Sequence, residues 1–214
     1  YEESWDGTTN ASAGLGGNGG SSGNFGYKNT MMGFALNLEY APAVGAADLG
    51  NGGAGTATQS TGSSINWALS NSTLVDGLEV GFGMGEDDAN NNTTGVTDVE
   101  SITGYLTYAM GPITVGYQQA ETSGGAAGAA INHVTAYGVA FNVNENLSLS
   151  LNNHENEYKK YGANANVTQE STGLAIAYTM GSASVKIQQN DQDNVSGTAG
   201  TNYSGTEVSL SLAF

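Results

Sequence analysis

The 214-residue sequence contains no cysteine, only two prolines and only four basic residues, all of them lysine (Lys28, Lys159, Lys160 and Lys186). The absence of cysteine excludes a disulfide scaffold and thiolate chemistry. With 20 acidic residues against four basic ones, the formal net charge is −16. Such a chain has no cationic surface for phosphates, so we expect no nucleic-acid partner. No apolar run reaches the roughly 18–20 residues of a membrane-spanning helix.

What the sequence does contain is a hydrophobic alternation with a period of two. In the last segment, Val208, Leu210 and Leu212 alternate with polar residues such as Glu207 and Ser209. This period is typical of a β-strand with one apolar face. Eleven segments show this period of two, at residues 24–29, 34–40, 65–70, 78–84, 102–108, 113–118, 136–143, 147–152, 173–179, 183–188 and 207–214. The sequence therefore predicts an all-β chain.

The connections between these segments are alternately short and long. We expect tight turns at residues 30–33, 71–77, 110–112, 144–146 and 180–182, and long loops at 41–63, 85–100, 121–132, 153–170 and 190–204. Short turns on one edge and long loops on the other indicate an antiparallel up-and-down meander. Outer-membrane β-barrels have this asymmetry.

The residue types on the two faces favour a lipid-facing barrel. The face opposite the apolar one is mostly Gly, Ala, Ser, Thr, Asn and Gln, which suits a water-filled lumen better than a solvent-exposed sandwich surface. Its charged residues are Lys28, Glu39, Glu79, Lys186 and Glu207. Aromatic residues near the ends of the apolar face predict an interfacial girdle, formed by Tyr40, Tyr108, Tyr117, Tyr178 and Phe214. The prediction is a transmembrane antiparallel β-barrel, with a soluble β-sandwich and a disordered or fibrous chain as alternatives.

Three segments resemble the trimeric general porins of Gram-negative outer membranes. The terminal strand Val208-Ser-Leu-Ser-Leu-Ala-Phe214 is similar to the signal for barrel insertion. Residues 25–42 resemble the porin hairpin that follows the inward-folded third loop. The opening Tyr1-Glu-Glu-Ser-Trp-Asp-Gly7 is similar to the end of that constriction loop.

This resemblance implies a homotrimer of 16-stranded barrels in the outer membrane, surrounded by its lipid. Residues 1–23 would be the end of the constriction loop, and residues 24–214 would be barrel strands 6–16. Because bacterial barrels have even strand numbers, we expect the first five strands to lie outside this sequence. A twelve-stranded barrel, with one more strand among residues 50–64, is the alternative.

A passive pore needs a hydrated lumen and a charged constriction but no catalytic residues. The sequence predicts a channel for small hydrophilic solutes and ions and no enzyme, with His133 and His154 at ordinary polar positions. Candidate constriction residues are Glu2, Glu3 and Asp6, which together with the lumen charges above predict a preference for cations. A substrate-selective channel and a surface barrel acting as an adhesin, surface-layer protein or phage receptor are the alternatives.

One group of acidic loop residues is dense enough to suggest a metal site. Glu86, Asp87 and Asp88 are consecutive, and carboxylate oxygens are ligands that Ca²⁺ prefers. They lack the spacing of an EF-hand loop, so a solvated acidic surface is the alternative. We expect no cofactor other than this Ca²⁺.

Overall fold

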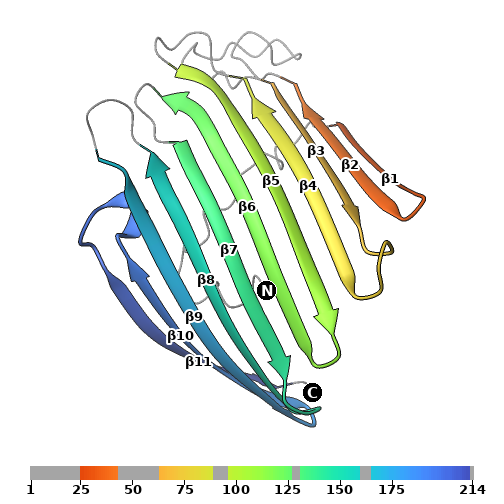
Figure 1. Cartoon of the computed structure of the whole chain (residues 1–214), viewed down its shortest axis with the longest axis vertical. Coiled ribbons are helices and arrows are strands. Elements are labelled where there is room, and N and C mark those ends of the chain that lie inside the picture. The colour runs from red at the N-terminus through yellow and green to blue at the C-terminus, as the bar shows by residue number, and fades with distance from the viewer. Residues whose placement is uncertain (1–24, 43–62, 89–95, 127–130, 160–164, 213–214) are drawn as a thin grey trace.

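The computed structural model describes residues 25–42, 63–88, 96–126, 131–159 and 165–212. They form one curved antiparallel sheet in which every strand pairs with its neighbours in the sequence (Figure 1). Its strands are β1 (Phe25–Met31), β2 (Phe34–Ala41), β3 (Ser64–Asn71), β4 (Leu78–Asp87), β5 (Val96–Met110), β6 (Ile113–Ala126), β7 (Ile131–Asn142), β8 (Leu147–Lys159), β9 (Val167–Met180), β10 (Ala183–Asp193) and β11 (Tyr203–Leu212). A short 3-10 helix, η3 (Val195–Gly197), lies between β10 and β11.

Tight turns join the strands at one end of the sheet. Two of them contain only two residues and begin with glycine, at Gly111 (φ 58°) and Gly181 (φ 60°). Glycine adopts a positive φ without steric cost, and a glycine at the first turn position is typical of two-residue hairpins. The connections that alternate with these turns lie at the opposite end of the sheet.

The predicted number and order of strands are confirmed, but the predicted strand ends at the loop edge are wrong. β4 continues to Asp87, β6 to Ala126, β8 to Lys159 and β10 to Asp193, while β5 begins at Val96 and β9 at Val167. Much of the predicted loops 121–132 and 153–170 is therefore strand. The backbone ladder continues where the apolar alternation stops, because ladder hydrogen bonds do not depend on side-chain polarity.

The two faces of the sheet have an inverted pattern of burial, which β9 shows most clearly. On one face, Leu174 and Ile176 are 48% and 41% exposed. On the other, Gln169, Ser171 and Ala175 are 3%, 2% and 5% exposed. Soluble proteins bury large apolar side chains and expose amides. We call the apolar, exposed face the outer face and the polar, covered face the inner face.

The apolar part of the outer face is a band at the tight-turn end of the sheet. It includes Leu106, Val115, Val139 and Ile187, all exposed. Toward the loop edge the outward positions become charged, at Glu86, Glu100, Glu121, Glu155, Glu170 and Asp191. Within the described residues, no helix is long and apolar enough to cross a membrane. In the same part of the chain, β1 and β11 form the two edges of the sheet and are not paired with each other.

Candidate pore wall

The strand registers place all five predicted lumen charges on the inner face. In β1 to β4, Lys28 pairs with Asn37, Glu39 pairs with Asn66, and Glu79 pairs with Thr107 of β5. In β10 and β11, Lys186 lies opposite Ala177 and Ser209, and Glu207 lies opposite Gln188. Asp87, at the end of β4, is a further inner-face carboxylate, opposite Ser64. These positions follow from the alternation alone, because one face is small and polar along every strand.

The other predicted residues have different locations. Tyr40, Tyr108, Tyr117 and Tyr178 lie on the outer face, where each pairs with an outward residue of the neighbouring strand. Glu2, Glu3, Asp6 and Phe214 lie outside the described residues. The predicted acidic constriction and the terminal aromatic therefore stay predictions.

The inner face of β1 to β5 contains a groove of about 600 Å³. Its floor consists of two complete rows of inner-face positions across the five strands, one running from Lys28 to Thr103 and the other from Gly26 to Ser101. Four of these positions are Gly or Ala, and the Asn66 side chain lies over one of them, Gly85. Lys28, Glu39 and Asp87 supply charges of both signs along the groove.

Tyr105 lies on the inner face next to this groove. Its hydroxyl donates a hydrogen bond to Oε1 of Glu79 at 2.8 Å, and the Thr103 hydroxyl beside it accepts one from Gln118 Nε2 at 3.2 Å. These bonds hold the Tyr105 ring and the Glu79 carboxylate along the wall. The period of two along residues 102–108 gives Tyr105 this inward position.

The described inner face of β8 to β10 carries one lysine, Lys186, and no carboxylate. It contains eight buried polar residues, which we call the upper polar cluster: Asn152, His154, Asn156, Gln169, Ser171, Gln188, Asn190 and Gln192. The registers place them side by side, with His154 opposite Ser171 and Asn156 opposite Gln169. Most of them fall in segments that the sequence predicted as loop. The signal that could have found them is the repeat of polar residues at every second position.

A described part of the β10–β11 connection folds over this cluster. The Ser196 backbone N–H donates to Oε1 of Gln169 at 2.8 Å, and Asn194 Nδ2 donates to the carbonyl of Thr168 at 2.9 Å. Buried Gly197 packs against the ring of Tyr158, an inner-face residue of β8. Part of the β10–β11 connection therefore covers the inner wall at the loop edge.

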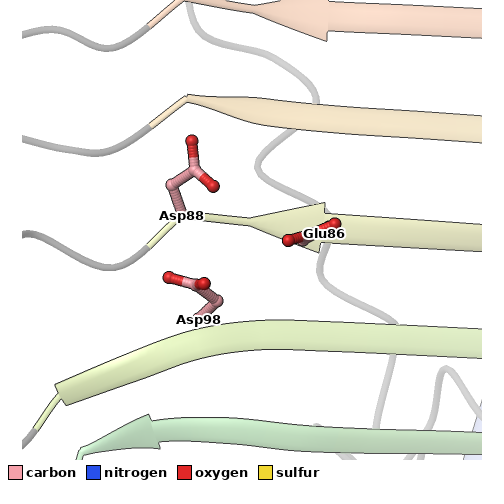
Figure 2. A group of neighbouring side chains, drawn as sticks. All are labelled: Glu86, Asp88 and Asp98. Carbon is pink, nitrogen blue, oxygen red and sulfur yellow. The ribbon is translucent and has the colours of Figure 1, made fainter.

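The predicted Ca²⁺ group is rearranged in the structure. Figure 2 shows Glu86, Asp88 and Asp98 gathered where β4 ends and β5 begins, with one carboxylate oxygen of each within 4.8 Å of the others. Asp87 is replaced by Asp98 in this group, because adjacent residues of a strand point to opposite faces. The three side chains are exposed, so this is a solvated acidic cluster and Ca²⁺ binding stays a prediction.

Asp87 lies beyond the apolar band, since outward Glu86 precedes it. Partial burial raises the pKa of the Asp87 carboxyl, the neighbouring Ser64 hydroxyl opposes this shift, and the charge of Asp88 reinforces it. The carboxylate of Asp87 is therefore neutralised at a higher pH than that of an ordinary aspartate.

The two histidines do not share a site. His133 lies on the outer face with its Nε2 3.1 Å from Oε2 of Glu121, whereas His154 is buried on the inner face. Because one histidine lies on each face, they cannot act together on one substrate.

Comparison with solved structures identifies the fold. The chain is similar to an anion-selective porin from Comamonas acidovorans, with a TM-score of 0.66 and 15% identity over 89% of this chain and 59% of that one. A NanC porin has a TM-score of 0.48 and 11% identity over 89% of this chain and 98% of its own. The sequence matches no family model and no curated protein.

At this identity the first comparison defines the fold alone. The chain has a porin-like fold, an antiparallel up-and-down sheet of the kind that forms barrel walls. It spans less than two thirds of the length of the Comamonas acidovorans porin.

Proposed function

We propose that this chain forms the wall of a water-filled channel in a bacterial outer membrane, through which small hydrophilic solutes and ions diffuse passively. The observation that carries the proposal is the inverted burial of β9 and its neighbours. Large apolar side chains point outward and stay exposed, while amides and hydroxyls are covered on the inner face. An apolar outer band with a polar interior is what a strand needs between lipid and an aqueous lumen.

The inner-face charges support a preference for cations. The described part of the wall carries four inward carboxylates, Glu39, Glu79, Asp87 and Glu207, against two inward lysines, Lys28 and Lys186. The difference is 2 − 4 = −2, so the wall attracts cations into the lumen. The selectivity named for the Comamonas acidovorans porin belongs to that protein, since wall charges are side chains that the fold does not determine.

The test is conductance across a planar lipid bilayer that contains the full-length protein. We expect stable, ohmic single-channel steps and, across a salt gradient, a reversal potential with the sign of cation preference. A reversal potential of the opposite sign would contradict the selectivity but not the channel. Protein that folds in detergent yet conducts no ions would favour the surface-barrel alternative.

A further inference from the structure

The β10–β11 connection, residues 194–202, folds inward over the inner wall at the loop edge. The structure describes this connection from end to end. The two strands that it joins are paired up to Gln192 and Tyr203, and a turn of two residues is enough to join strands paired in this way. The connection is several residues longer than that, so its inward fold is an addition that the sheet itself does not require.

Hydrogen bonds within the connection give it a fixed shape. The Val195 backbone N–H donates to the Thr201 carbonyl at 2.8 Å, and the Thr198 N–H donates to the Val195 carbonyl at 3.1 Å. The Asn194 side chain adds a further bond, since its Oδ1 accepts from the Gly200 N–H at 2.9 Å. The connection is therefore a small folded unit that keeps its own shape against the wall.

Two residues of this unit have a left-handed backbone. Asn194 has a φ of 55° and Ser196 has a φ of 56°. Asparagine adopts this conformation at little cost, but serine does so rarely. A strained backbone persists where the surrounding contacts hold it in place. The Ser196 backbone N–H donates to Oε1 of Gln169 on β9, so this docking contact stabilises the strained conformation.

Gly197 is the residue by which the connection fits against β8. It is buried, and a Cβ added to it would lie 2.7 Å from Cγ of Tyr158. No side chain fits there, because Cγ is close to the β8 backbone and cannot move away from it. The Tyr158 hydroxyl also donates to Oε1 of Gln169, at 3.4 Å. At the loop edge, a solute in the lumen therefore meets the connection in front of β8 and β9.

The connection occupies space in the lumen without adding charge to it. Residues 194–202 contain asparagine, valine, serine, glycine, threonine and alanine, and no charged residue. The inward carboxylates of the described wall lie on β2, β4 and β11. The described inner faces of β8 and β9, against which the connection packs, carry none. Different parts of the chain therefore control the space and the charge that a solute meets.

We propose that residues 194–202 set the upper size limit of the solutes that enter the channel from the loop edge. Gly197 and Gln169 are the residues that keep the connection in this position. The limit acts on size alone, because the connection is uncharged, and it is separate from the ion preference of the lumen. This inference rests on the proposed channel function and names the segment that restricts access to it.

The test measures the single-channel conductance of the full-length protein with poly(ethylene glycol)s of graded length, added to one side of the bilayer at a time. A polymer that enters the channel lowers the conductance, and an excluded polymer does not. Gly197→Val removes the fit against Tyr158. Replacement of residues 194–201 by Asn-Gly removes the segment and joins β10 to β11 by a two-residue turn. In both variants we expect a larger conductance and the entry of longer polymers from one side only, with an unchanged reversal potential.

The matched control is Gly205→Val, which adds the same side chain to the inner face of β11, where an added Cβ meets no atom within 4 Å. We expect this control to keep the exclusion limit of the wild type. Amide hydrogen exchange at Ser196 shows whether Gly197→Val has displaced the connection.

An unchanged exclusion limit in the Asn-Gly variant, or in Gly197→Val with a displaced connection, would overturn the size limit and leave the channel function intact. An equal shift in Gly205→Val would overturn it as well. Absence of conductance in the wild type would overturn both proposals.

Discussion

The two faces of the sheet are built from the same backbone, yet neighbouring residues on one strand have opposite surroundings. On β9, Ile176 is an exposed apolar residue, while Ala175 beside it is covered. In a soluble protein this arrangement would expose a large apolar surface to water, at roughly 25 cal/mol for every Å². The comparison teaches that the outer face needs an apolar solvent, whereas the inner face needs water and hydrogen-bonding partners.

The largest difference in stability is expected between two single variants of β5, one with a lysine on the outer face and one with a lysine on the inner face. Leu106→Lys puts an ammonium group in the apolar band, whereas Thr107→Lys puts it on the inner face opposite Glu79. A lysine at the lipid midplane costs about 2–4 kcal/mol. We expect Leu106→Lys to lower stability by this amount in urea unfolding with lipid vesicles, and Thr107→Lys to be close to wild type. Equal losses would contradict the assignment of the faces.

Inner-face and outer-face carboxylates should differ in their effect on ion selectivity. Replacing Glu39 and Glu79 by glutamine removes two inward charges, which takes the described wall from −2 to zero. We expect the reversal potential to lose most of its cation preference. The matched exchange of Glu155 and Glu170, on the outer face beyond the apolar band, should change it much less. A larger change from the outer pair would contradict this account, because it would indicate that ions pass along the outer face.

A smaller, local effect is expected where the β10–β11 connection meets the wall. Gln169 accepts hydrogen bonds from the Ser196 backbone N–H and from the Tyr158 hydroxyl. Gln169→Ala leaves a donor on η3 without its partner, at a cost of about 1–3 kcal/mol. We expect faster amide hydrogen exchange at Ser196. The outward Gln119→Ala variant is the control, and unchanged exchange in both would show that this contact does not hold η3.

The smallest effect concerns the pH dependence of Asp87. The pKa of Asp87 is raised in the folded state, so the protonated carboxyl stabilises the folded protein relative to the unfolded chain. This stabilisation is fully present at any pH below the pKa of Asp87 in the unfolded chain. That contribution is lost as the pH rises through the folded pKa. Asp87→Asn should therefore be slightly more stable than wild type at neutral pH and equal to it in acid, by urea unfolding. The adjacent outward Glu86→Gln is the control, and an identical gain there would indicate general acidic repulsion instead.

The sequence was sufficient to predict the strands of the apolar band and the inward position of their charged residues. Val208, Leu210 and Leu212 differ so strongly from their neighbours that the strand, its face and the position of Glu207 follow directly. The same contrast places Lys28, Glu39 and Lys186, since a period of two leaves only one inward phase.

Sequence reasoning was not sufficient beyond the apolar band, where both faces are polar. Asn153 and Glu155 point outward while His154 and Asn156 point inward, so no apolar contrast marks the strand. The fold of η3 onto Gln169 depends on contacts between distant residues, which periodicity does not encode. Continuing the phase of β4 from Glu79 through Gly85 would have shown that Asp87 points away from Glu86.

The most direct test of the central claim is a cysteine scan along β6, because the chain has no cysteine and each introduced thiol is unique. Residues Thr114 to Tyr117 are replaced one at a time in protein reconstituted in lipid. We predict that cysteines at 114 and 116 react with a charged, water-soluble thiol reagent, while probes attached at 115 and 117 are quenched by a lipid-borne quencher. Equal aqueous reactivity at all four positions, or quenching at 114 and 116, would contradict a lipid-facing outer face and a water-filled interior.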